Sequence, residues 1–97
     1  MSKFSIGRVV MTAGVAEKCN EDKWFKHFVQ KSLGRYYECD WGDTCEEDCA
    51  LNDNAIEAGD RLLAVYKYET DGGDHSVIWI ITEWDRSVTT VLFPHEY

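Results

Sequence analysis

The sequence lacks the segments that would place a protein in a membrane or direct it to secretion. No apolar run approaches the ~20 residues that cross a bilayer. The N-terminus, Met-Ser-Lys-Phe-Ser-Ile-Gly-Arg, has neither an apolar signal core nor a cleavage site. Hydrophobic residues make up 44% and aromatic residues 13% of the 97 residues, which is too rich for a disordered chain. We therefore expect a single globular domain, residues 1–97, in the cytoplasm.

Patterns of known catalytic chemistry are missing as well. The three histidines are scattered over the chain, no nucleophile elbow is present, and Gly72-Gly73 belongs to a turn signal rather than to a phosphate loop. Glu83 and Asp85 flank Trp84 and would share one face of a strand, where paired carboxylates can do acid–base work or hold a divalent cation. At the end of a strand, however, such acids more often face solvent. The sequence therefore predicts a binding protein without catalytic residues.

Basic residues are absent from the middle of the chain, where acidic residues accumulate. The net charge is −8, and residues 38–60 alone contribute −9 because they contain nine acids and no Lys or Arg. Residues 1–37 carry a net charge of +4 and residues 61–97 a net charge of −3. The field of the acidic segment repels nucleic acid and attracts basic protein surfaces, but such a segment also suits a solvated loop that aids solubility. Its acids are Glu38, Asp40, Asp43, Glu46, Glu47, Asp48, Asp53, Glu57 and Asp60.

The spacing of the apolar residues predicts an α+β fold. One main helix and a short helix are expected to pack on a small antiparallel sheet with a C-terminal three-strand meander. A turn is expected at 71–74, and the run 77–81 is apolar on both faces, which suits a central strand. The predicted strands are 4–12, 61–69, 76–85 and 88–93.

Two segments have the spacing and end signals of helices. Asn20 is expected to cap the main helix, which extends to Tyr37. A short helix is expected at 50–58, with Asn52 as its cap and Gly59 at its C-terminal end. The predicted apolar face of the main helix comprises Trp24, Phe25, Phe28, Val29 and Leu33.

The four cysteines, Cys19, Cys39, Cys45 and Cys49, all lie in the first half of the chain. Disulfides are disfavoured in the cytoplasm, which leaves free thiols or a metal site. No two of them have the two-residue spacing of the commonest zinc motif, but Cys45 and Cys49 would share one face of a helix. A helix of about 27 Å separates Cys19 from Cys39, so His27 is the alternative to Cys19 as fourth ligand.

Four such ligands suit one structural zinc ion in a closed tetrahedral site. The ion would hold the segment 38–50, which has few apolar residues of its own. The neighbouring acids argue against a metal, because they raise thiol pKa values unless a cation offsets their charge. Zinc and free thiols both stay open, and without a metal the segment is expected to be a loosely held loop.

Eight stretches of the chain form a recognisable pattern that covers most of its length and is most specific at the C-terminal end. They are residues 7–12, 40–43, 46–48, 51–52, 59–63, 78–83, 85–94 and 96–97. The pattern resembles a family of small, mostly uncharacterised acidic proteins of phages, plasmids and integrative elements. The matched positions include Asp40 and Asp43 but not all four cysteines, so the resemblance implies that a metal site here would be a local addition.

Small acidic proteins of mobile elements are similar in character to anti-CRISPR and anti-restriction inhibitors, whose acidic patches occupy basic channels of host nucleases. The resemblance therefore implies a non-catalytic inhibitor of a host defence protein, a CRISPR effector or a restriction enzyme with a basic surface. Complementary potentials speed such an association and compete with DNA. Trp41 or Tyr36 would supply a buried aromatic anchor. The expected contact residues are Asp40, Trp41, Asp43, Glu46, Glu47 and Asp48.

Two other functions also fit the sequence. A dimeric accessory protein of a mobile element would pair through an edge of its sheet, such as the first or the last strand. A small-ligand-binding protein would use a pocket between helix and sheet that is lined by tyrosines and tryptophans. Direct binding of nucleic acid is disfavoured, because the neutralisation of phosphates needs clustered Lys and Arg.

Overall fold

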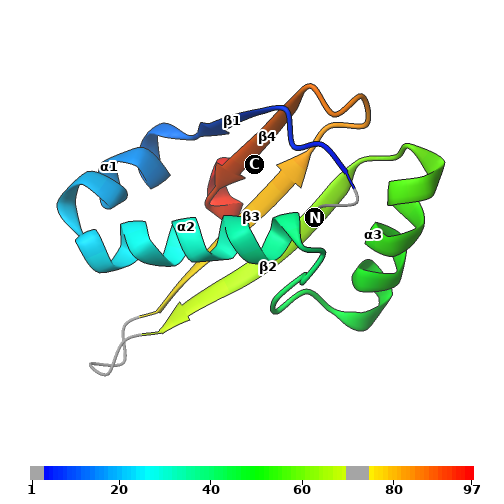
Figure 1. Ribbon diagram of the computed structural model, residues 1–97. Helices are drawn as coiled ribbons and strands as arrows, with labels where there is room; N and C mark the ends of the chain where they lie inside the picture. The colour runs from blue at the N-terminus through cyan, green and yellow to red at the C-terminus, as the bar shows by residue number, and fades with distance from the viewer. Residues whose placement is uncertain (1–3, 70–74) are drawn as a thin grey trace.

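The described residues, 4–69 and 75–97 of a computed structural model, form a four-stranded sheet (Figure 1). Its strands are β1 (Arg8–Met11), β2 (Leu62–Glu69), β3 (His75–Thr82) and β4 (Val88–Leu92), in the order β1-β4-β3-β2. β2, β3 and β4 form the expected antiparallel meander, with β3 in the interior. β1 pairs in parallel with β4, so the sheet is mixed, and the expectation of an antiparallel sheet is corrected. The turn expected at 71–74 lies outside the described residues.

In the same parts of the chain there are three α-helices and one short 3-10 helix, which confirms the α+β class. They are α1 (Ala13–Glu21), α2 (Lys23–Tyr37), α3 (Glu46–Ala58) and η1 (Pro94–Glu96). α1 was not expected, because it has no side-chain cap and contains a glycine. α3 begins before the short helix predicted at 50–58, and it ends as expected at Gly59, whose φ is 76°. No helix in the described part of the chain has the length and apolar character to cross a bilayer.

The main helix begins at Lys23 and not at Asn20. Asp22 has an extended backbone, and its Oδ1 accepts hydrogen bonds from Trp24 N at 3.0 Å and Phe25 N at 3.2 Å. These bonds satisfy two N–H groups that have no partner within the helix. The aspartate therefore ends α1 and starts α2 within a single residue.

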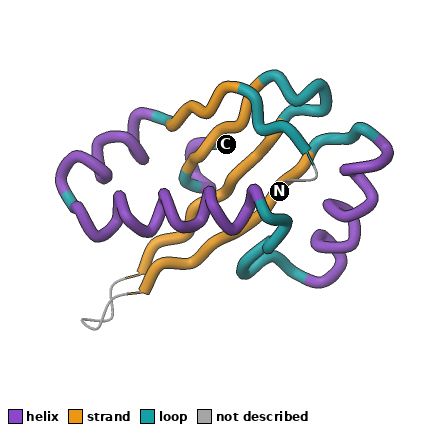
Figure 2. Tube along the Cα trace, viewed as in Figure 1, coloured by secondary structure: helices purple, strands orange, loops and turns teal. Residues whose placement is uncertain are grey.

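α2 lies across one face of the sheet and makes the second layer of the fold (Figures 1 and 2). Its buried side chains, Phe25, Val29, Ser32 and Tyr36, recur at the spacing of one helical face. Trp24 is 67% exposed, so the prediction that it belongs to the buried face was wrong. The neighbouring Phe25 is fully buried, and a rotation of about 100° per residue turns Trp24 away from the sheet.

A chain of buried hydroxyl groups joins α2 to the sheet. Tyr36 OH lies 2.7 Å from Thr82 Oγ1, which lies 2.7 Å from Thr89 Oγ1, and Thr89 donates to Ile6 O at 2.6 Å. Because the proton of Thr89 points to Ile6, Thr82 donates to Thr89 and Tyr36 donates to Thr82. Burial raises the pKa of Tyr36, so the phenol remains a donor.

Side chains from residues 43–52 close the outer edge of β2. Asn52 forms two hydrogen bonds with Leu63: its Oδ1 accepts from Leu63 N at 3.1 Å, and its Nδ2 donates to Leu63 O at 2.8 Å. Val65 N donates to Thr44 Oγ1 at 2.8 Å. The side-chain amide of Asn52 therefore takes the place of a neighbouring strand, and α3 is held against the sheet.

The segment before α3 continues this closure. Lys67 N donates to Asp43 Oδ2 at 2.9 Å, and Asp43 N donates to Val65 O at 2.8 Å. Gly42 forms a parallel bridge with Val65 and has a φ of 63°, and a Cβ at this position would overlap the ring of Tyr66. The outward N–H groups from Leu63 to Lys67 therefore all have acceptors, and these hydrogen bonds hold the segment that was expected to be a loose loop without a metal.

Replacement of Asn52 by alanine tests the closure of this edge. Asn52 is 4% exposed, and the Asn52→Ala variant leaves both backbone groups of Leu63 without a partner. We expect the free energy of unfolding to fall by about 2–4 kcal/mol, measured by urea denaturation. Asn54→Ala, an exposed position on the same helix, is the control, with a change of about 0.5 kcal/mol or less. Equal losses in the two variants would contradict this account of the edge.

Candidate functional site

Residues 38–60, named the acidic segment here, run from the end of α2 through α3 and form the side of the protein next to β2 (Figure 1). Eight of its nine acidic residues are exposed, and Asp48 is half-buried. The acids divide into residues that hold the segment in place and residues that face solvent.

Asp40 and Asp43 hold the beginning of the segment. The carboxylate of Asp40 accepts hydrogen bonds from Arg35 Nε at 2.8 Å, from Arg35 Nη2 at 3.2 Å and from Gly42 N at 3.1 Å. The hydrogen bond from Arg35 is the main cause of a lowered pKa for Asp40. Asp43 Oδ2 accepts a hydrogen bond from the backbone N–H group of Lys67 at the β2 edge. Both were predicted to contact a partner, but the structure gives their carboxylates intramolecular roles.

Trp41 and Tyr36 are not the surface anchors that the sequence suggested. Trp41 is 5% exposed, and its Nε1 donates to Asp53 Oδ1 at 2.9 Å. Tyr36 is fully buried, and the two rings pack edge-to-face with their centroids 5.5 Å apart. The expectation of an exposed aromatic at these positions is therefore corrected, because both rings contribute more by burial in the core.

Five of the other six acids do not hold the segment in place. Their side chains form no hydrogen bond or ion pair with any described residue. They are Glu46, Glu47, Asp48, Glu57 and Asp60. The first three lie in the first turn of α3, where the helix dipole favours negative charge. Glu57 lies in the last turn, where the dipole disfavours it, so helix stability does not explain its presence.

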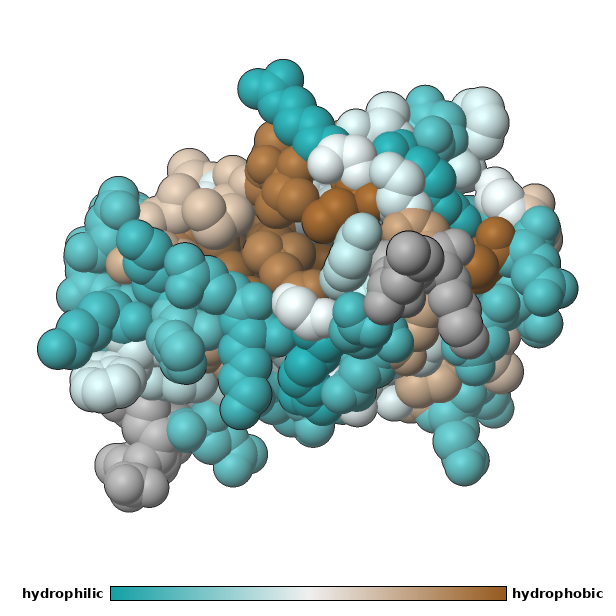
Figure 3. All heavy atoms as spheres, in the orientation of Figure 1, coloured by the Kyte–Doolittle hydropathy of each residue, from teal (hydrophilic) through white to brown (hydrophobic). Residues whose placement is uncertain are grey.

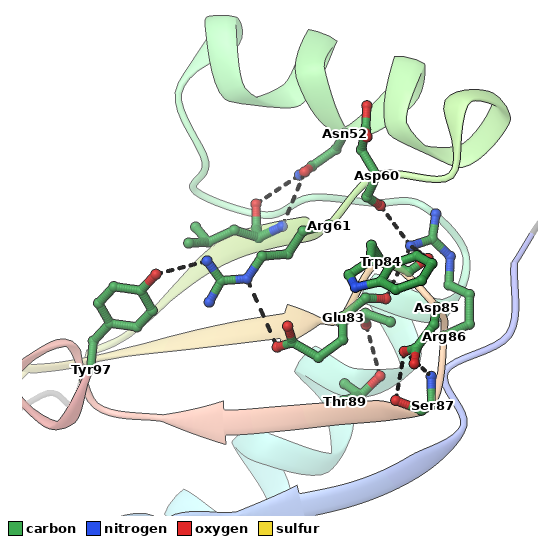
Figure 4. A network of polar contacts seen from close by, with 12 residues as sticks. Asn52, Asp60, Arg61, Glu83, Trp84, Asp85, Arg86, Ser87, Thr89 and Tyr97 are labelled. Atoms are coloured by element: carbon green, nitrogen blue, oxygen red, sulfur yellow. Dashed lines mark hydrogen bonds and ion pairs between the residues drawn. The ribbon is translucent and has the colours of Figure 1, made fainter.

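Arg86 joins the C-terminal end of α3 to the turn between β3 and β4 (Figure 4). Its Nη2 donates to Ala55 O at 3.0 Å, and its Nη1 donates to Asp60 O at 2.6 Å. A cation thus meets carbonyl groups at the negative end of the helix dipole. The backbone of Arg86 has a φ of 61°, and Asp85 Oδ1 accepts from Ser87 N at 3.0 Å, so both sides of the turn are fixed.

The same turn presents Trp84, which is 67% exposed, near the end of the acidic segment (Figure 4). Glu83 and Asp85, on either side of this residue, were expected to be of interest, whereas the exposed ring itself was not predicted. A tryptophan in a polar turn between two acids was the signal for an exposed aromatic side chain.

Glu83 and Asp85 do not form a pair of carboxylates on one strand face. β3 ends at Thr82, so both acids lie in the turn. Glu83 Oε2 lies 3.8 Å from Arg61 Nε, while Asp85 binds the backbone and hydroxyl of Ser87. The two acids therefore take part in separate interactions, and they do not share the strand face that was expected to bring their carboxylates together.

The four cysteines are not arranged as a metal site. Among the described residues no group of three or more His, Cys, Asp or Glu side chains could hold a metal ion. Cys19 is buried in α1, whereas Cys39 follows α2 and Cys45 is exposed before α3. His27, the alternative ligand, is exposed on α2. Burial raises the pKa of both Cys19 and Cys49.

This arrangement predicts graded thiol reactivity. With a thiol reagent near neutral pH we expect Cys45 to react first and Cys19 last, on the order of 100-fold more slowly, because only thiolates react and Cys19 is buried. Mass spectrometry of the labelled peptides gives the order. A metal chelator should leave every rate unchanged. If the chelator accelerated the labelling of Cys39, Cys45 and Cys49 together, a metal site would be present and this arrangement of free thiols would be wrong.

Tyr36, Trp41 and Tyr66, three of the aromatic side chains that a small-ligand pocket between helix and sheet could use, belong to the core. The chain matches no model of a protein family, no curated protein and no solved structure. The acidic segment is therefore the candidate functional site on its charge and geometry alone.

Proposed function

We propose that the protein is a non-catalytic inhibitor of a nuclease that targets nucleic acid, a CRISPR effector or a restriction enzyme of a host cell. It binds a basic surface of that nuclease through the acidic segment and acts in the cytoplasm. The observation that carries the proposal is the excess of negative charge in this segment on a rigid support. Nine acids and no Lys or Arg lie within residues 38–60.

The density of the charge supports competition with nucleic acid. α3 contains five acids in 13 residues, which corresponds to about 20 Å of helix. One strand of DNA carries about six phosphates over the same length. Glu46, Asp53 and Glu57 recur at intervals of seven and four residues, so they share one face of the helix. A channel that binds phosphates can therefore meet a row of carboxylates on this helix, in which Asp53 also accepts a hydrogen bond from Trp41 Nε1.

The rigidity of the segment supports the same function. Asn52, Thr44 and Asp43 tie it to β2, and Arg86 ties its end to the turn that follows β3. The backbone that carries Glu46, Glu47 and Asp48 is thus held in place before a partner arrives, which lowers the entropic cost of binding. Direct binding of nucleic acid or of an anionic membrane is not part of the proposal, because like charges repel.

Removal of the solvent-facing charges at the start of α3 tests the proposal. The triple variant Glu46→Gln, Glu47→Gln and Asp48→Asn keeps the size of each side chain and spares the acids that hold the segment. The readout is the transformation efficiency of a targeted plasmid in cells that carry one CRISPR or one restriction system, with and without the protein. For a system that the protein inhibits, we expect the triple variant to raise the transformation efficiency less than the natural chain does. The reason is weaker binding to the nuclease, which should be about 10- to 100-fold weaker when measured with the purified proteins. Binding of the natural chain should also weaken as salt is raised.

A matched variant separates the position of the charges from their number. Glu17→Gln, Glu21→Gln and Glu69→Gln remove the same charge from exposed positions outside the acidic segment. This control should inhibit as well as the natural chain. Equal inhibition by both triple variants, or no inhibition of any CRISPR or restriction system tested, would show that the acidic segment does not have this function.

A further inference from the structure

The edge of the sheet at β1 is open, in contrast to the edge at β2. The N–H group of Arg8 donates to Ser87 O at 3.1 Å and that of Thr12 donates to Val91 O at 3.0 Å, so both point toward β4. Because backbone groups alternate in direction along a strand, both the N–H and the C=O groups of Val9 and Met11 point away from the sheet. Within residues 4–69 and 75–97 no hydrogen bond from these two N–H groups is formed.

An apolar groove lies beside this open edge. Val9 is 40% exposed and Met11 is 45% exposed, and both line the groove together with α1 and α2. The groove has a volume of about 290 Å³ and corresponds to the brown hollow between β1 and α2 in Figure 3. Its other apolar side chains are Ala16, Cys19, Val29 and Leu33. An edge with free backbone groups and apolar side chains next to it is a template for another strand.

We propose that a second copy of the chain occupies this edge, through antiparallel pairing of β1 with β1 of the partner copy. The register that uses all the outward groups pairs Val9 with the partner's Met11 and Met11 with the partner's Val9. Four backbone hydrogen bonds then form, and the two-fold axis passes beside Val10. The side chains of Val9 and Met11 in the two copies come together and cover the groove-facing side of the new ladder.

Charge complementarity favours the same register. Arg8 and Thr12 lie on the face of β1 opposite Val9 and Met11, and Arg8 is placed across from the partner's Thr12. Thr12 Oγ1 donates to Glu96 Oε1 at 2.6 Å, while Glu96 Oε2 accepts one bond, from Gly14 N. A carboxylate oxygen can accept two such bonds. The guanidinium of Arg8, which has no partner among the described residues, therefore meets a carboxylate with a free acceptor site.

The position of the acidic segments agrees with this arrangement. They lie next to β2, at the opposite edge of each sheet. Pairing at β1 therefore puts the two segments, each with a charge of −9, at the far ends of an eight-stranded sheet. The dimer goes beyond the proposed inhibitor function and does not depend on it.

A proline at position 9 tests the open edge directly. Val9→Pro removes an outward N–H group and no hydrogen bond within the sheet, so the fold should persist. Sedimentation equilibrium of the natural chain should show a mass that rises with concentration toward twice 11.2 kDa. We expect Val9→Pro to weaken the dimer about 10- to 100-fold, and Val9→Ile, which keeps the N–H group and a β-branched apolar side chain, to leave it within a few-fold of the natural chain. Circular dichroism and urea denaturation confirm that each variant is folded.

A cysteine at position 10 tests the register. The two copies of Val10 face each other in a non-hydrogen-bonded pair with Cα atoms about 4.5 Å apart, which suits a disulfide. In a Cys45→Ser background, Val10→Cys should form a covalent dimer on mild oxidation. Thr90→Cys is the matched control, because Thr90 pairs with Val10 one strand farther from the axis. It should stay monomeric on a non-reducing gel.

A charge reversal tests the predicted ion pair. Arg8→Glu should weaken the dimer, whereas Lys31→Glu, an exposed position on α2 with the same charge change, should not. Two outcomes would overturn the proposal. One is a natural chain that stays monomeric at all concentrations, which would leave the edge to a strand of another protein. The other is a dimer that persists in Val9→Pro and does not cross-link in Val10→Cys, which would assign dimerisation to a different surface.

Discussion

The closure of the β2 edge is the interaction on which the rest of the structure depends. An edge strand exposes unpaired backbone groups, and here the amide of Asn52 binds both groups of Leu63 while Thr44 and Asp43 take the next two N–H groups. These bonds set the position of α3 relative to the sheet. They also hold a segment that has few apolar residues of its own.

This closure gives the acidic segment two kinds of carboxylate. Asp40, Asp43 and Asp53 bind groups of the protein itself, so their charge is partly used in the fold. Glu57 and the acids of the first turn of α3 face solvent and are held in place by their helix. Rigid, solvent-facing charge is what a basic partner can recognise at a low entropic cost. The two edges of the sheet therefore differ in chemistry, since the β2 side is closed and acidic and the β1 side is open and apolar.

Much of the fold followed from patterns within single elements. The apolar run at 77–81 predicted an interior strand, and Gly59 predicted the end of α3. The helix start was misplaced by a few residues, because Asn20 and Asp22 are both good caps and only the backbone at Asp22 is extended. The candidate site was partly predicted. Eight of the nine acids of 38–60 are exposed, but Trp41 and Tyr36 are buried, and Trp24 and Trp84 are the exposed tryptophans.

The sequence by itself determined the fold class, the meander and the concentration of negative charge, because these depend on residue type and on spacing along the chain. Only the tertiary structure decided that β1 pairs in parallel with β4, that Asn52 completes the edge of β2, and that no three of the described Cys, His, Asp and Glu side chains come together as a metal site. Each of these depends on contacts between residues distant in sequence, and no local pattern carries that information. Asn52, for example, was expected to cap a helix, and only the position of Leu63 on β2 shows that its side-chain amide binds the edge of the sheet instead.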